Sequence, residues 1–268
     1  MSTTKNISFK NTKIAYTSEG NGPDIIFIHG FLEARSMWAG YLSELKTNYK
    51  VTSIDLPGFG DSDCISTYHT MGLMGEAIMA VAEEENIHNF ILVGHSLGGY
   101  ISLALGEKYP EKIKGLILFH SHASADSEDI KTNRDRTIKV IENDGLSFLS
   151  NFIVDLFNKE NINRLQDKIE ELKIVSNKTK AKGITAALAG MRDRSGKISF
   201  LADTKIPIGF IIGKQDPRIP LQKIISQTAL VKEAHILMLD QVGHMGMHEA
   251  PEKCLDFIKY FAKTCQDK

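Results

Sequence analysis

Cysteine, net charge and long apolar runs are all scarce in this chain. Three cysteines in 268 residues, Cys64, Cys254 and Cys265, form no CxxC pair, which excludes a disulfide framework and favours a reducing cytoplasm. The 32 Lys and Arg residues balance 33 Asp and Glu residues, so no net field attracts nucleic acid. No window reaches the roughly 18 apolar residues of a membrane span, and the N-terminus lacks a signal-peptide core. We expect a cytoplasmic protein that acts on a small neutral molecule, with no indication of its oligomeric state.

Short apolar runs alternate with helical patterns along much of the chain. Six runs bounded by turn residues predict buried strands at 24–28, 50–54, 90–93, 113–119, 206–212 and 235–239. Residues 8–17 predict an initial hairpin, residues 74–85 have helical periodicity, and a last helix is expected after Pro251. Strands that alternate with helices need crossover connections. We therefore predict an α/β fold with a mostly parallel, twisted sheet and helices on both faces.

Residues 123–200 break this alternation, because their pattern predicts three or four successive helices and no strand. An all-helical insertion between two strands predicts a lid over the carboxyl ends of the strands, where open α/β sheets bind ligands. A scaffold extension away from the site is the alternative. The predicted core is 1–122 and 201–268. Apolar residues at helical spacing in the insertion are expected to pack rather than to bind ligand: Leu146, Phe148, Leu149, Phe152, Ile153, Leu156 and Phe157.

The strongest local motif is G-x-S-x-G at Gly94, Ser96 and Gly98, placed between an expected strand and an expected helix. A sharp strand-to-helix turn strains the serine, so glycines two residues away avoid clashes and leave the hydroxyl exposed. The alternative is a glycine-rich turn that only joins the two elements. The pattern is not the GxGxxG of dinucleotide-binding proteins, and no acidic residue follows at the ribose position. His95, inside the motif, is expected to pack.

Two further segments, together with this motif, resemble the α/β-hydrolase superfamily over almost the full length outside the insertion. His29-Gly30-Phe31 resembles the superfamily's oxyanion loop, which implies that the backbone N–H groups of Phe31 and Leu97 bind the substrate oxygen. Residues 55–62 resemble its DxxGxGxS turn, so Asp55 is interpreted as a turn residue. Serine at the nucleophile position disfavours the haloalkane dehalogenases and epoxide hydrolases of this fold, which use aspartate there.

In the superfamily the catalytic residues follow the chain order serine, acid, histidine, which implies that the acid and then the histidine lie after Ser96. His244 lies in residues 243–251, which resemble a GHxxxxExP segment, and we prefer it to His248, which lacks the preceding glycine turn. Asp216 follows the penultimate expected strand and would orient the imidazole and stabilise its charged form. Asp126, the nearest carboxylate after the preceding strand, is the alternative acid.

Other polar residues give weaker signals. His120 and His122 could share a metal, but a catalytic zinc site needs three protein ligands and no third one is near in the sequence. We expect neither a metal nor a cofactor. Arg192, Asp193 and Arg194 end the helical block and are expected to be solvated or to anchor the lid, the alternative being an inward arginine that binds an anionic substrate.

These residues predict a serine hydrolase of the carboxylesterase type. Ser96 would attack a small to medium apolar acyl substrate, most simply a carboxylic ester, and form an acyl-enzyme. His244 would transfer the proton, and Asp216 would orient the His244 imidazole. The same triad would also serve a carbon–carbon bond hydrolase or a perhydrolase. A ligand-binding receptor that keeps the triad and signals by lid movement is a further alternative.

Overall fold

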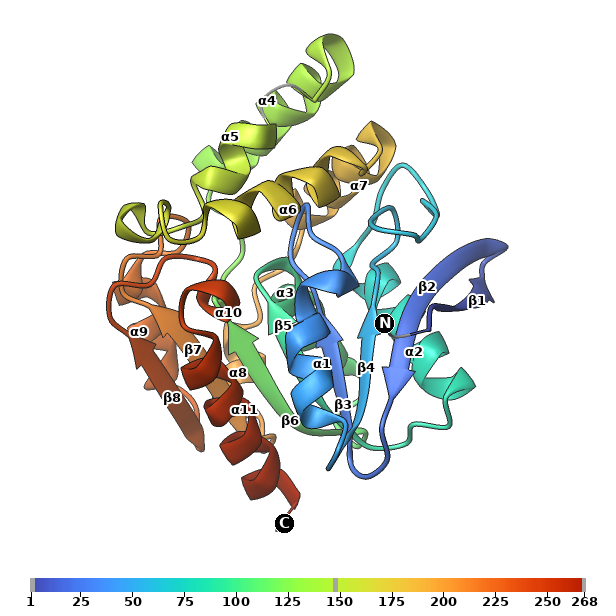
Figure 1. Ribbon diagram of the computed structural model, residues 1–268, viewed down its shortest axis with the longest axis vertical. Coiled ribbons are helices and arrows are strands. Elements are labelled where there is room, and N and C mark those ends of the chain that lie inside the picture. Colours follow the sequence, from blue (N-terminus) through green and yellow to red (C-terminus); the bar gives the residue numbers. More distant parts are fainter. Residues whose placement is uncertain (1–2, 147–148, 267–268) are drawn as a thin grey trace.

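An eight-stranded sheet forms the centre of the protein in a computed structural model, which describes residues 3–146 and 149–266 (Figure 1). The strand order is β1-β2-β4-β3-β5-β6-β7-β8. Strands β1, β2 and β4 pair antiparallel, and the remaining pairs are parallel, which confirms the predicted mostly parallel α/β sheet. The strands are β1 Lys5–Phe9, β2 Thr12–Glu19, β3 Asp24–Ile28, β4 Lys50–Ile54, β5 Phe90–His95, β6 Ile113–Phe119, β7 Ile208–Gly213 and β8 Ala234–Leu239.

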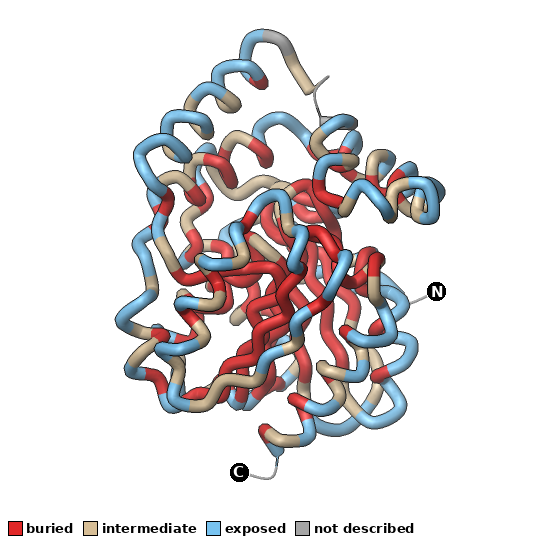
Figure 2. The backbone as a smooth tube through the Cα atoms, turned by 90° about the vertical axis from the view of Figure 1, so that its left-hand side faces the viewer, coloured by how far each residue is buried: buried red, intermediate tan, exposed pale blue. Residues whose placement is uncertain are grey.

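Differences in burial explain why some strands are continuously apolar in the sequence and others are not. Strands β5 and β7 are buried at every position because helices cover both faces of the sheet, and such strands are continuously apolar. The edge strand β1 is mostly exposed. The predicted hairpin is formed by β1 and β2, whose turn residues Lys10 and Asn11 have φ values of 51° and 59°, as a two-residue turn requires. Figure 2 shows the buried residues gathered along the central strands.

Helices cover the two faces of the sheet. In Figure 1, α1 and α11 lie in front of the sheet and α2 and α3 lie behind it. Helix α2 begins after Thr70, whose side chain accepts a hydrogen bond from the Leu73 amide, and it buries the apolar face that its periodicity predicts. The helices of this core are η1 Arg35–Trp38, α1 Ala39–Leu45, α2 Met71–Glu84, α3 Leu97–Lys108, α8 Ile198–Asp203, α9 Leu221–Thr228, α10 Gly246–Glu249 and α11 Pro251–Gln266.

A helical insertion joins β6 to β7 and lies at the top of Figure 1. It comprises α4 Glu128–Asp144, α5 Leu149–Val154, η2 Lys159–Asn161, α6 Gln166–Asn177 and α7 Ala181–Arg192, with α4 packed on α7 and α5 on α6. Helix α8 spans the predicted boundary at residue 200 and packs against α3 of the core. Of the apolar residues predicted to pack in the insertion, Phe148 and the side chain of Leu149 lie outside the described part of the chain. No helix within the described ranges has the length and apolar character to cross a membrane.

Candidate active site

Ser96 occupies a sharp turn between β5 and α3. Its backbone has φ 48° and ψ −110°, a strained conformation for a residue with a side chain. The close approach explains the flanking glycines: a Cβ on Gly94 would lie 2.4 Å from the Gly98 carbonyl oxygen, and one on Gly98 would lie 2.4 Å from that of Ile28. The strand–serine–helix turn predicted from the motif is therefore present, and the glycines have the steric role expected of them.

His244 and Asp216 come together from two different loops. Asp216 follows β7 and His244 follows β8, and His244 Nδ1 lies 2.7 Å from Asp216 Oδ2. The other carboxylate oxygen accepts hydrogen bonds from the amides of Arg218 and Ile219 at 2.8 and 3.0 Å. These bonds fix the orientation of the carboxylate.

The charge of Asp216 determines the tautomer of His244. Burial alone would raise the pKa of Asp216, but the neighbouring His244 and a hydrogen bond from His120 hold that pKa well below its ordinary range. An ionised carboxylate only accepts hydrogen bonds, so His244 Nδ1 carries the proton. Nε2 is therefore left as the basic nitrogen, the state that a general base requires.

Ser96 and His244 line one cavity of about 430 Å³. Phe31, from the loop after β3, lines the same cavity. The insertion contributes apolar side chains, which are Ile130, Phe152, Leu156, Leu188 and Met191. Apolar periodicity predicted packing for residues of the insertion, and Ile153, Leu156 and Phe157 are buried while Phe152 packs against the core. Phe152 and Leu156 line the cavity as well. The cavity thus joins the carboxyl ends of the strands to the insertion.

Of the two residues expected to donate to an oxyanion, Phe31 lines this cavity and Leu97 directly follows Ser96. Leu97 is the first residue of α3, and the first amides of a helix have no partner within the helix. The Phe31 ring packs edge-on against Phe59 and Phe152, with centroid distances of 6.0 Å in both cases. These contacts hold the loop that carries the Phe31 amide beside the serine turn.

The alternative acid and base have other partners. Asp126 lines the cavity, but it accepts hydrogen bonds from Arg134 Nε at 2.5 Å and from Arg194 Nη1 at 2.6 Å. His248 is not among the residues that line the Ser96 cavity, and its buried Nε2 has no hydrogen-bond partner within the described residues. Asp55 accepts amide hydrogen bonds from Arg35 and Asp61 and also pairs with the Arg35 guanidinium, which confirms its role in the turn.

His120 has a different environment from the one its sequence position suggested. Its Nδ1 lies 3.5 Å from Asp216 Oδ2, so His120, Asp216 and His244 form a group of possible metal ligands within 4.8 Å of one another. In the folded chain His120 therefore has two further potential ligands close by, both from distant parts of the sequence. However, burial lowers the pKa of His120 to about 4, so the ring is neutral and only one of its nitrogens accepts a hydrogen bond. The Gly246 amide lies 3.0 Å from Nε2, which makes Nε2 the acceptor and leaves the proton on Nδ1, the nitrogen that faces Asp216.

Glu33 and His95 form a buried pair beside the serine that sequence reasoning missed. Glu33 Oε2 lies 2.9 Å from His95 Nδ1 and also accepts the Gly30 amide at 2.5 Å. His95 Nε2 donates to the backbone oxygen of His244 at 2.9 Å, since a carbonyl only accepts. Burial alone would lower the pKa of His95 and raise that of Glu33, but their mutual attraction shifts both pKa values the other way. The pair is therefore an imidazolium and a carboxylate.

Replacing Glu33 by glutamine is expected to lower the free energy of unfolding by about 3–5 kcal/mol near pH 5.5, because His95 loses its buried counter-charge. The pKa of Glu33 lies below its ordinary value of 4.5 and that of His95 above its ordinary value of 6.5. The stabilisation is therefore complete between these values, and it decreases as the pH falls below the first or rises above the second. Urea unfolding at about pH 5.5 and about pH 9 measures the difference.

The matched control for this experiment is Glu83→Gln, which changes an exposed glutamate on α2. It should leave the free energy of unfolding within about 0.5 kcal/mol at both pH values. A destabilisation by Glu33→Gln that is equally large at both pH values would contradict an ionised Glu33–His95 pair.

Glu249 connects the His244 loop to the insertion. Its Oε1 accepts the amides of Gly243 and Met245, on either side of His244, at 2.9 and 3.1 Å. Its Oε2 accepts the Asn158 amide at 3.0 Å and Asn161 Nδ2 at 2.7 Å. One buried carboxylate thus holds two segments that are distant in the sequence.

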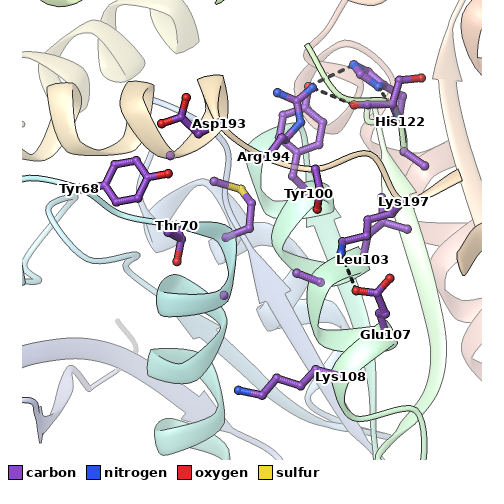
Figure 3. A pocket seen from close by; sticks show the side chains of 17 residues that line it. Tyr68, Thr70, Tyr100, Leu103, Glu107, Lys108, His122, Asp193, Arg194 and Lys197 are labelled. Atoms are coloured by element: carbon purple, nitrogen blue, oxygen red, sulfur yellow. Dashed lines mark hydrogen bonds and ion pairs between the residues drawn. The ribbon is translucent and has the colours of Figure 1, made fainter.

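A second cavity of about 460 Å³ adjoins the first (Figure 3). Tyr100 and His122 line both cavities, and the Arg194 guanidinium lies over the Tyr100 ring at 3.8 Å. Arg192 pairs with Asp193 and with Asp135 of α4, so its ion pairs join segments of the insertion to each other and do not tie it to the core. Neither Arg192 nor Arg194 lines the Ser96 cavity. The predicted alternative of an inward arginine at these two positions therefore has no support in the first cavity.

The mostly parallel sheet and the strand–serine–helix turn together define an α/β-hydrolase-fold protein. A family model described as the alpha/beta hydrolase fold matches residues 23–251. The chain belongs to this family, as its sequence motifs predicted.

Known proteins of this fold are similar over nearly the whole chain. The 3-oxoadipate enol-lactonase 1 of Acinetobacter baylyi is 25% identical over 265 residues, which cover 96% of this chain and 95% of the relative. A thermophilic esterase from Thermogutta terrifontis superposes with a TM-score of 0.93 and 24% identity, covering 98% of this chain and 99% of the other. The enol-lactonase from Burkholderia xenovorans LB400 has a TM-score of 0.89 and 17% identity, with coverages of 97% and 100%. The predicted enzyme class, an α/β hydrolase of the carboxylesterase type, is confirmed.

Proposed function

We propose that this enzyme is a serine hydrolase that cleaves small to medium carboxylic esters through an acyl-enzyme on Ser96. The observation that carries the proposal is the cavity that Ser96 shares with His244, whose Nδ1 is bound to the Asp216 carboxylate. The names of the relatives agree with this chemistry, since a lactone is a cyclic ester and esterases and lactonases both break an acyl–oxygen bond.

The proposed reaction divides ester cleavage into two steps. Ser96 Oγ attacks the acyl carbonyl while His244 Nε2 accepts the serine proton. The amides of Phe31 and Leu97 stabilise the oxyanion, and the same imidazolium then protonates the departing alcohol. Water repeats the sequence on the acyl-enzyme, releasing the carboxylic acid and restoring the serine. Asp216 keeps His244 in the required tautomer throughout.

The proposal includes residues 123–200 as a lid. Five apolar side chains from this segment line the Ser96 cavity, so the segment would exclude water from the acyl group and select its size. A cavity of about 430 Å³ is within the size range of small-molecule sites. We keep the cytoplasm as the proposed location.

A fluorophosphonate probe tests the identity of the nucleophile. Peptide mapping of the labelled protein is expected to find the probe on Ser96, because only a serine activated by a neighbouring base reacts rapidly. Ser96→Ala should abolish labelling, whereas Ser226→Ala, which changes an exposed serine on α9, should leave it unchanged. A label on any other residue would require a different mechanism.

A further inference from the structure

Arg218 places a guanidinium at the Ser96 cavity. It lies two residues after Asp216, and its amide donates to Asp216 Oδ1 at 2.8 Å, so its backbone is tied to the proposed catalytic acid. Its side chain lines the same cavity as Ser96 and His244. The guanidinium lies over the ring of Phe152, 4.3 Å from the centroid, and this ring also lines the cavity. Arg218 is an exposed residue overall, and the Phe152 ring is the contact that places its guanidinium at the cavity.

The guanidinium of Arg218 has no ion-pair partner among the described residues, unlike the other arginines around the cavity. Arg134 and Arg194 share the two oxygens of Asp126, and Arg192 pairs with two further aspartates. Both oxygens of Asp216 are already bound, one by His244 Nδ1 and the other by backbone amides. Stacking on Phe152 uses only the face of the guanidinium and leaves its N–H groups free to donate.

The charged groups that line the cavity favour an anionic ligand. Of the groups that line the cavity, Glu33 is neutralised by His95 and Asp126 by Arg134, so the charge of Arg218 is the one left unbalanced. The nearest other carboxylates that act on Arg218 are Asp155 and Asp216, neither of which lines this cavity. A planar guanidinium with parallel N–H donors matches the two oxygens of a carboxylate, and such bidentate pairs are both strong and directional.

We propose that Arg218 binds a second, ionised carboxylate of the substrate, so that the preferred substrates are half-esters of dicarboxylic acids. This inference rests on the proposed ester hydrolysis at Ser96 and refines its substrate class. The small neutral molecule expected from the balanced composition is replaced by a monoanion, because the local surplus of positive charge at the cavity outweighs the neutrality of the whole chain.

Two esters of equal acyl length test the proposal. Mono-4-nitrophenyl adipate carries a distal carboxylate, and 4-nitrophenyl hexanoate carries a methyl group at that end. Arg218→Gln is expected to lower kcat/KM for the adipate half-ester about 10- to 100-fold and to change the value for hexanoate less than about threefold. Arg218→Lys keeps the positive charge but loses the two parallel N–H donors of the guanidinium. Its kcat/KM for the adipate half-ester should therefore lie between those of the wild type and Arg218→Gln. Arg136→Gln, which removes an exposed arginine on α4, is the matched control and should leave both values unchanged.

These measurements distinguish failure of the proposed carboxylate site from failure of the proposed hydrolase. An equal loss for both esters in Arg218→Gln, or no loss for either, would overturn the carboxylate site while leaving the proposed hydrolase intact. If Ser96→Ala hydrolyses both esters at the wild-type rate, the proposed function itself fails. A loss confined to the half-ester, together with partial retention in Arg218→Lys, supports the site.

Discussion

Ser96→Ala is expected to lower kcat for 4-nitrophenyl butyrate roughly 10⁴- to 10⁶-fold, because the acyl-enzyme can no longer form. The residual rate would come from binding and from the oxyanion donors alone. Since alanine has a Cβ in the same position, the strained turn at residue 96 should persist, and the free energy of unfolding should change by less than about 1 kcal/mol. Steady-state kinetics and urea unfolding of the purified variant measure the two quantities.

The same variant separates an enzyme from a receptor that retains the triad. A hydrolase loses turnover on Ser96→Ala and keeps its affinity for substrate, whereas a receptor has no turnover to lose. Ser226→Ala, which removes the hydroxyl of an exposed serine, is the control and should retain the wild-type kcat. Residual activity in Ser96→Ala equal to that of the wild type would count decisively against Ser96 as the nucleophile.

Asp216→Asn is expected to lower kcat about 10³- to 10⁴-fold with little change in KM, because an amide can donate to His244 Nδ1 and thus favour the wrong tautomer. The pKa of Asp216 lies below its ordinary value of 3.8, held there by His244 and His120 against the effect of burial. The wild-type carboxylate therefore stays ionised throughout the neutral range, and the defect should persist from about pH 6 to pH 9. Measurement of kcat across that range tests both statements.

Asp126→Asn is the matched control, since Asp126 lines the same cavity but binds arginines instead of a histidine. Its effect on kcat should be smaller than that of Asp216→Asn by at least about tenfold. The reverse order of effects would transfer the role of the acid to Asp126.

The features that the sequence predicted correctly are those that depend on residues close together in the chain. Buried strands such as β5 are short apolar runs bounded by turn residues, so they were predicted within two residues of their observed ends. The G-x-S-x-G turn depends only on neighbouring residues, and its steric requirements follow from the motif itself. Asp216 and His244 lie 28 residues apart, but their order and their places after two strands made both of them predictable.

Residues whose roles depend on distant partners escaped prediction. Glu33 reads as an ordinary loop glutamate, and only its contact with His95, 62 residues away, explains its burial. Phe152 and Leu156 have helical spacing, which predicted their packing, but that they also line the cavity depends on how the insertion packs. Arg218 is an exposed loop residue, and only its contact with Phe152, which is distant in the sequence, ties it to the cavity. These positions depend on tertiary packing, which has no local signature in the chain.

The contacts of Glu249 restrict which part of the insertion can move independently of His244. Because one carboxylate binds both the amides around His244 and the chain at 158–161, and because the His244 amide also donates to the Leu156 oxygen at 2.8 Å, that part of the insertion and the base are a single mechanical unit. A swing of residues 156–161 would move the His244 imidazole away from Ser96. Helix α7 is also held to the core, because the His69 amide donates to the Ala186 oxygen at 3.0 Å and the backbones of Gly58 and Gly183 pack closely. In the proposed hydrolase, opening of the cavity without displacement of His244 would therefore depend on α4.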